Sequence, residues 1–311
     1  MKIAVLFNGY GSQYVGMGKE FYDQERIVQE YFEEASNCLN SNFVKLCFAS
    51  SDNDLSKMSN AYPAIFLMNS DIMAVLAQEG IIPLLMGGYN DGIISAMHAA
   101  TGISFPDGLY LLNKYTHFYQ EFLDTTTMKA VRVIGALREV VEDACYRASD
   151  EQSSVYVALY EEPDHCVIAG HSAAVDKARE LIFEHKGAQT DDVSLAFGLH
   201  SRLMEPVVGQ LSLYLEKIDF KNVTVPLIAS DTGRVLMTGA ELKEHVIGFL
   251  STPLHWHYLS NVLDLYDIVI QIGDGNGLEQ RVKRLYPHKQ VITVTKRSDI
   301  DSIQKLITTP E

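Results

Sequence analysis

The side chains that could carry chemistry gather where apolar runs stop. Residues 81–86 form such a run, and it leads into Gly87-Gly88-Tyr89-Asn90-Asp91-Gly92, after which helical spacing resumes. This pattern predicts a strand, a sharp turn and a helix. The carboxylate of Asp91 could act as a nucleophile, whereas the Asn90 amide has no proton whose loss at neutral pH gives one. His200 could activate water as a general base, or it could be a hydrogen-bonded structural histidine.

Three other patterns could be mistaken for sites. Gly170-His171-Ser172 looks like a nucleophile turn, but Ser172 is well explained as a helix N-cap. His255-Trp256-His257 suggests a metal pair, yet no third ligand is spaced for one, and an aromatic-rich helix start is about as favoured. The turn at 273–277 lacks the βαβ unit and acidic residue of a dinucleotide loop. We therefore expect no metal and no cofactor.

The predicted helices and strands that must position these residues alternate with two different spacings along the chain. Residues 1–7 read as a buried strand, a glycine-rich turn follows, and amphipathic helical patterns cover 21–39 and 64–77. A compact alternation then predicts strand, helix, two strands, helix and strand at 130–135, 138–148, 155–160, 166–169, 173–185 and 190–195. Longer alternation returns afterwards, with strands at 225–229, 268–272 and 290–294. This order predicts an α/β fold in which a small βαββαβ unit of the ferredoxin-like type is inserted into a larger one.

Composition limits the class of protein and its partners. The 311 residues are 47% hydrophobic, enough for a sizeable core, and the net charge of -15 would repel nucleic acid and anionic membranes. No apolar run approaches the roughly 20 residues of a membrane span, and the N-terminal run does not resemble a signal peptide. The four cysteines form no C-x-x-C pair and fit buried reduced thiols: Cys38, Cys47, Cys145 and Cys166. We expect a cytoplasmic protein with neither a nucleic-acid nor a membrane partner.

The charge is uneven near the end of the chain. Between 280 and 298 there is no acidic residue, but there are six cations: Arg281, Lys283, Arg284, Lys289, Lys296 and Arg297. Such a stretch is either a solvated helix face followed by a strand edge or a docking surface for an anionic partner.

Four stretches of the chain occur together in one known family. They are Phe7-Asn8-Gly9-Tyr10-Gly11-Ser12-Gln13 with Gly16-Met17-Gly18, Val167-Ile168-Ala169-Gly170, His200-Ser201-Arg202-Leu203-Met204-Glu205-Pro206, and Ile272-Gly273-Asp274-Gly275. In this the chain resembles the malonyl-CoA:acyl carrier protein transacylases, which load malonyl groups for fatty-acid and polyketide synthesis. In most members of this family the first stretch has the sequence F-x-G-Q-G-S-Q, the third H-S-x-L-M-x-P and the last I-G-P-G. The match is collinear over nearly the whole chain.

The resemblance implies an architecture and a set of partners. It implies a large α/β-hydrolase-like domain with a mostly parallel sheet over residues 1–127 and 197–311, and a ferredoxin-like small domain over 128–196. It also implies that an acyl carrier protein or synthase module, and a CoA thioester, are possible partners.

The resemblance also assigns catalytic positions, and this chain departs from them. The family's serine, in G-H-S-x-G, aligns with Asn90, so an acyl-serine intermediate cannot form there. The family's base is retained as His200. The backbone N–H after the serine and one from the first glycine-rich loop form the oxyanion hole, which places Asp91 and Tyr10 there. The Asp91 side chain is expected to point elsewhere.

The pocket positions depart in the same way. The arginine that holds the malonyl carboxylate aligns with Tyr115, and the adjacent Lys114 would point about 100° away on a helix. Two pocket glutamines align with Tyr10 and Tyr62, and the histidine before the serine aligns with Tyr89. Large rings at these positions would fill volume, and their hydroxyls would need partners if buried.

Two functions remain open at this point. The first is a non-catalytic relative that binds a carrier protein, a synthase partner or an acyl thioester. The second is an active acyltransferase or thioester hydrolase of altered specificity, in which Asp91 attacks as a carboxylate or His200 activates water.

Overall fold

The computed structural model describes residues 1–275 and 277–308, and its larger part is built on one sheet. The strand order is β11-β10-β1-β2-β7-β8, and every neighbouring pair is parallel except β7 and β8. The central strand β1 is buried along its whole length, as expected for a strand covered on both faces. The bounds are β1 Ile3–Phe7, β2 Leu85–Gly88, β7 Leu227–Ile228, β8 Val235–Leu236, β10 Ile268–Ile272 and β11 Gln290–Val294.

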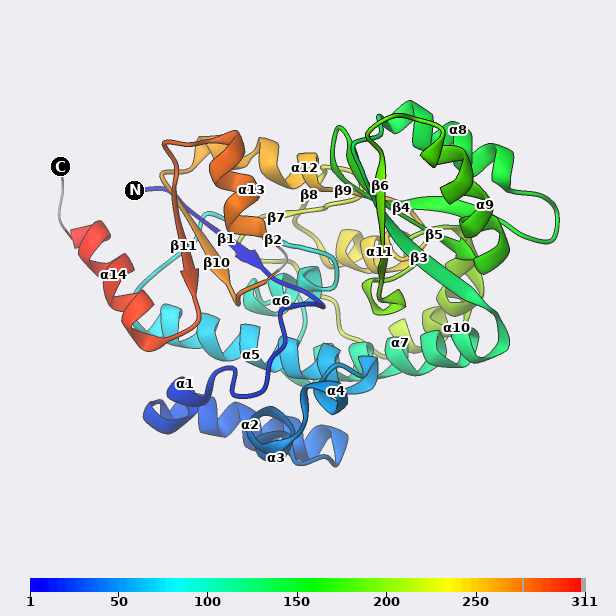
Figure 1. Cartoon of the computed structure of the whole chain (residues 1–311). Coiled ribbons are helices and arrows are strands. Elements are labelled where there is room, and N and C mark those ends of the chain that lie inside the picture. Colours follow the sequence, from blue (N-terminus) through cyan, green and yellow to red (C-terminus); the bar gives the residue numbers. More distant parts are fainter. Residues whose placement is uncertain (276, 309–311) are drawn as a thin grey trace.

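Helices cover this sheet, and Figure 1 shows α1 to α3 lying outside α5. The long helix α5 is buried along most of its length, so it forms a core layer rather than a surface helix. In the described residues, no helix combines the length and the apolarity needed to cross a bilayer. The helices of this part are α1 Lys19–Gln24, α2 Arg26–Leu39, α3 Phe43–Ala49, α4 Asp52–Leu55, α5 Met58–Gln78, α6 Gly92–Ala99, α7 Phe105–Thr125, α10 Glu205–Leu215, α11 Gly239–Phe249, α12 Trp256–Asn261, α13 Leu278–Leu285 and α14 Arg297–Thr308.

The smaller part has its own sheet and its own apolar core. Its strand order is β6-β3-β5-β4-β9, with α8 and α9 packed on it (Figure 1). Neighbours are antiparallel except β4 and β9, and β9 comes from the segment that precedes α12. The larger part of the chain therefore contributes one edge strand to the smaller sheet. The bounds are β3 Met128–Ile134, α8 Arg138–Ala148, β4 Val155–Glu162, β5 His165–His171, α9 Ser172–Phe183, β6 Gln189–Val193 and β9 Leu254–His255.

Most predicted elements are present, and three of them, α8, β10 and β11, have the predicted bounds. The strand predicted at 81–86 is displaced to Leu85–Gly88, because Pro83 has no N–H to donate to a ladder. The helix predicted at 21–39 is two helices, separated where Glu25 adopts an extended backbone. The strand predicted at 190–195 ends at Val193 and is followed by a single 3₁₀ turn, η1 Leu195–Phe197.

The expectation of four buried thiols is wrong for one of them. Cys47, Cys145 and Cys166 are buried and unpaired, but Cys38 is an exposed free thiol near the end of α2.

The turn between β2 and α6 is held by close backbone packing. A Cβ atom on Gly88 would lie 1.9 Å from the nitrogen of Ile93, and one on Gly92 would lie 2.3 Å from the carbonyl oxygen of Phe7. Both distances are far below van der Waals contact, so only glycine fits. Between them, Asn90 has a φ of 54°, a left-handed conformation that asparagine tolerates better than most residues. The central side chain of the turn is thereby aimed by backbone geometry.

We expect Gly92→Ala to destabilise the protein by about 1–3 kcal/mol or more, because the added carbon collides with backbone that cannot move without disturbing β1. The matched control is Gly209→Ala in α10, where nothing lies within 4 Å of the added carbon. There the change should stabilise by about 0.5–1 kcal/mol. Urea unfolding of both variants measures the two effects. Equal stability of Gly92→Ala and the unaltered protein would contradict the close packing.

Candidate functional site

The structure brings Asn90 and His200 into direct contact. The Asn90 side-chain oxygen lies 2.9 Å from Nε2 of His200, and its side-chain nitrogen donates to the carbonyl of Phe197 at 2.6 Å. Only 5% of Asn90 and 3% of His200 is exposed. Both ends of the amide are therefore used inside the protein.

The ring of His200 faces the chain's own oxygen atoms on both sides. Nδ1 lies 3.0 Å from the carbonyl of Phe249, and Nε2 lies 3.1 Å from that of Phe197 as well as facing Asn90. Burial lowers the pKa of His200, and the two carbonyls offset this only in part. The ring is neutral at pH 7 and has one N–H for these acceptors. Neither nitrogen points at open space where a water could lose its proton.

The Asp91 side chain points into the site, contrary to expectation. Its Oδ1 accepts a hydrogen bond from the backbone N–H of Tyr10 at 2.8 Å. Burial raises the pKa of Asp91 to about 7, although the N–H groups of Tyr10 and of Asp91 itself stabilise the carboxylate. The sequence alone could not show this, because side-chain direction at the start of α6 depends on the loop after β1.

Three of the predicted tyrosines lie in one row of rings. Ring centroids are 5.9 Å apart for Tyr10 and Tyr62, and 5.6 Å apart for Tyr62 and Tyr115. The row continues to Tyr119, 5.7 Å from Tyr115, a residue that sequence reasoning missed. The sequence did contain a sign of this contact, because Tyr115 and Tyr119 are four residues apart and such residues share one face of a helix. Lys114, one residue before Tyr115, instead lies over the rings of Tyr110 and Tyr214.

Two of the four tyrosine hydroxyls in this row find partners on one short segment. Tyr119 donates to the carbonyl of Leu195 at 2.7 Å, and Tyr62 donates to that of Ala196 at 2.6 Å. Together with the bond from Asn90 to Phe197, the three carbonyls of η1 each accept from a different site side chain. Buried hydroxyls need such partners. These hydrogen bonds therefore offset the free-energy cost of burying the Tyr62 and Tyr119 hydroxyls.

Little space is left behind Asn90. The cavity there has a volume of about 10 Å³ and is lined mainly by apolar side chains together with Asn90, Asp91 and Tyr115. A cavity needs about 10–15 Å³ to hold one water molecule. The space behind Asn90 is therefore about the size of one water molecule.

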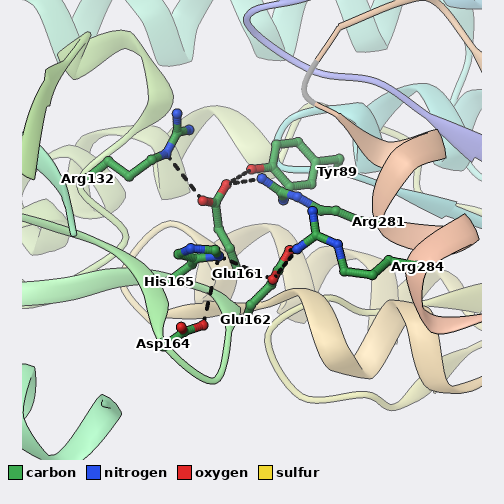
Figure 2. Close-up of polar contacts among 8 residues, drawn as sticks. All are labelled: Tyr89, Arg132, Glu161, Glu162, Asp164, His165, Arg281 and Arg284. Carbon is green, nitrogen blue, oxygen red and sulfur yellow. Dashed lines mark hydrogen bonds and ion pairs between the residues drawn. The ribbon is translucent and has the colours of Figure 1, made fainter. Parts of the chain in front are cut away.

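Tyr89 lies apart from the other tyrosines, in a buried ionic cluster (Figure 2). Its hydroxyl donates to Glu161 at 3.0 Å, and the same carboxylate pairs with Arg281 at 2.5 Å and with Arg132 at 3.2 Å. The Glu161 side chain is 3% exposed. Burial would raise the pKa of Glu161, but the two guanidiniums outweigh it and hold the pKa below its ordinary value. The carboxylate joins the turn after β2 to β4 and α13.

Five of the six cations in the stretch at 280–298 form ion pairs within the described chain. Arg281 is buried on Glu161, and Arg284 pairs with Glu162. Its other paired cations also bond within the described chain: Lys283 to Glu279, Lys289 to Asp264, and Arg297 to Glu25, Glu79 and Asp301. These contacts favour a structural role for the stretch.

The remaining candidate patterns are placed as follows. Ser172 is the first residue of α9, so the N-cap prediction is wrong, and its hydroxyl donates to the carbonyl of Thr127 at 3.2 Å. His255 stacks on Tyr160 at 4.6 Å at the start of α12. Part of the turn at 273–277 lies outside the described residues, which do not include Asn276.

One side-chain group in the described residues has the spacing of a metal site, and sequence reasoning missed it. It consists of Glu162, Asp164 and His165 (Figure 2). Glu162 is already bonded to Arg284 through both of its oxygens, at 2.7 and 2.6 Å. We therefore interpret these three side chains as part of an ion-pair network at the protein surface.

Comparisons with known proteins agree on one family. The acyl transferase domain family matches residues 5–248. The malonyl CoA-acyl carrier protein transacylase of Bacillus subtilis strain 168 is 30% identical over 310 residues, which are 99% of this chain and 97% of that protein. The crystal structure of MCAT from Streptococcus pneumoniae is 29% identical with a TM-score of 0.90, over 98% of this chain and 100% of that one. A malonyl-transacylase solved in complex with its type II PKS acyl-carrier protein superposes with a TM-score of 0.92 over 98% and 100% of the two chains, and its 23% identity supports the fold alone.

Glu161→Gln should destabilise the protein by about 3 kcal/mol or more, because it leaves the guanidiniums of Arg281 and Arg132 without their buried carboxylate. The matched control is Glu162→Gln, which removes only partly exposed ion pairs, those with Arg284 and His165, and should cost about 1 kcal/mol or less. Urea unfolding at pH 7 compares the two. Similar losses for both variants would argue against Glu161 as the link between the two parts.

The Asp91 carboxyl should make stability depend on pH. Its pKa is about 7 in the folded protein against 3.8 for an ordinary aspartate, so the folded form holds a proton that the unfolded chain has released. Raising the pH from 4 to 8 therefore favours unfolding, by about 3–4 kcal/mol for this group. Asp91→Asn removes the titration, and the free energy of unfolding of the unaltered protein should fall relative to that variant as pH rises. A constant difference between pH 4 and pH 8 would be incompatible with this environment for Asp91.

Proposed function

The chain belongs to the acyl transferase family that includes the malonyl-CoA:acyl carrier protein transacylases, and we propose that it binds a carrier protein or a synthase partner without transferring an acyl group. The observation that carries this proposal is the Asn90–His200 contact. A transferring enzyme needs a nucleophile at the turn and a base that can take its proton. Here the turn holds an amide, and both ends of that amide are bonded inside the protein.

We infer a division into an α/β-hydrolase-like domain, residues 1–127 and 197–311, and a ferredoxin-like domain, residues 128–196. The order β6-β3-β5-β4 with antiparallel neighbours supports the ferredoxin-like assignment, as does the separate core of this part. The largely parallel sheet around β1 supports the other assignment.

The filled pocket favours a protein partner over an acyl thioester. The cavity behind Asn90 holds about 10 Å³, and Tyr115 stands at the position assigned to the carboxylate-binding arginine. A malonyl group would meet an aromatic ring in place of a fixed positive charge. The relative solved in complex with its acyl-carrier protein makes a carrier protein the first partner to test.

The two catalytic alternatives have weaker support. The Asp91 carboxylate is hydrogen-bonded to the Tyr10 amide, which lowers its power to attack a carbonyl carbon. His200 has Asn90 and Phe197 at Nε2 and Phe249 at Nδ1, so a water cannot approach either nitrogen in the ring plane. Hydrolysis through His200 would require Asn90 to move.

The proposal is tested by intact mass spectrometry after incubation with malonyl-CoA or acetyl-CoA, with and without a holo acyl carrier protein. We expect no acyl-enzyme, no acylated carrier protein and no release of CoA above the rate without protein. Isothermal titration calorimetry should show that the holo carrier protein binds, although no acyl group is transferred. His200→Ala is the matched variant, since any genuine catalysis should vanish with it. Transfer or hydrolysis that depends on His200 would overturn the non-catalytic function, and failure of the carrier protein to bind would exclude it as the partner.

A further inference from the structure

The carboxylate of Asp91 lies where two backbone N–H groups converge. One belongs to Tyr10, in the loop after β1, and its nitrogen is 2.8 Å from the carboxylate oxygen. The other is the N–H of Asp91 itself, just before α6, which helps to stabilise the carboxylate. Amides from two segments that meet at the start of a helix form a favourable position for negative charge. In this chain that position is taken by a side chain of the protein.

The carboxylate is packed tightly into this position. A Cβ atom on Gly9 would lie only 2.4 Å from its Oδ1, so the absence of a side chain at Gly9 is what makes room for it. Asp91 is 4% exposed. Burial raises the pKa of the Tyr62 and Tyr115 hydroxyls, and the nearby Asp91 charge raises both further.

We propose that Asp91 is an internal occupant of the oxyanion position, and that it excludes the carbonyl oxygen of a thioester independently of the residue at position 90. This inference rests on the proposed function, because it assigns the closure of the same site to a specific side chain. The inference predicts what is needed to restore acylation at this site. A serine placed at position 90 would have a neighbouring base but no amide pair to hold the oxygen, so that change alone should not restore acylation.

The first experiment measures the occupancy directly, by hydrogen exchange of the Tyr10 amide in the full chain. In the unaltered protein and in Asp91→Asn, which keeps an acceptor oxygen in place, the amide should exchange slowly. In Asp91→Ala it should exchange at least tenfold faster, while the amides of Ile93 and Ile94 in α6 keep their rates. Unchanged exchange at Tyr10 in Asp91→Ala, or loss of protection throughout α6, would refute the assignment.

The second experiment measures acylation by acetyl-CoA in three variants: Asn90→Ser, Asn90→Ser with Asp91→Asn, and Asn90→Ser with Asp91→Ala. In the reaction the introduced serine oxygen bonds to the acetyl carbon, the carbon–sulfur bond breaks, and the serine proton passes through His200 to the CoA thiolate. Intact mass should show the acyl adduct forming about 10²-fold faster in the Asp91→Ala double variant, the size of effect that oxyanion donors have on acyl transfer. Equal rates in all three, including no reaction in any, would overturn the proposal.

These outcomes separate the inference from the function on which it rests. The proposed function fails if the unaltered protein transfers or hydrolyses an acyl group. The role of Asp91 fails on the Tyr10 amide or on the comparison among the serine variants. Each can therefore fail while the other holds.

Discussion

The start of α6 approaches β1 so closely that its first residue has no room for a side-chain carbon. Gly92 faces the Phe7 carbonyl at the end of β1, and Gly88 faces the backbone of Ile93. This approach sets the path of the three residues between the glycines and places them beside the loop after β1. The same geometry that would present a nucleophile in an acyl transferase here delivers the Asp91 carboxylate to the Tyr10 amide. The backbone is retained, and the side chains it presents decide what the site can do.

Those side chains fill the site in a mutually consistent way. The carbonyls of Leu195, Ala196 and Phe197 are successive acceptors, and each receives a different donor from the rebuilt pocket. A buried tyrosine or asparagine without such an acceptor would cost about 1–3 kcal/mol. The segment before His200 thus satisfies Tyr62, Tyr119 and Asn90, whereas the hydroxyl of Tyr10 donates to the carbonyl of Ser56 and that of Tyr89 to Glu161. These buried polar side chains are matched to acceptors of the protein itself.

The sequence predicted the α/β fold with a larger and a smaller part, but not the side-chain contacts around Asn90. The strands at 268–272 and 290–294 and the helix at 138–148 were predicted with their observed bounds, because apolar periodicity and flanking polar residues mark them locally. The partner of Tyr89 was not predicted. Glu161 lies 72 residues away in sequence, and Arg281 lies a further 120 beyond it, so no local pattern links them. The direction of Asp91 was mispredicted because the family pattern describes its backbone and leaves its side chain free.

The place of β1 in the sheet has a consequence for the order in which the protein is made. Residues 3–7 leave the ribosome long before one of their neighbours, β10, residues 268–272. The unit from β3 to β6 has local contacts and can close while synthesis continues. Strand β1, in contrast, waits with an unpaired apolar edge until β10 has been synthesised. During translation the exposed β1 edge, rather than the acyl transferase pocket, is the part of this molecule most in need of protection from aggregation.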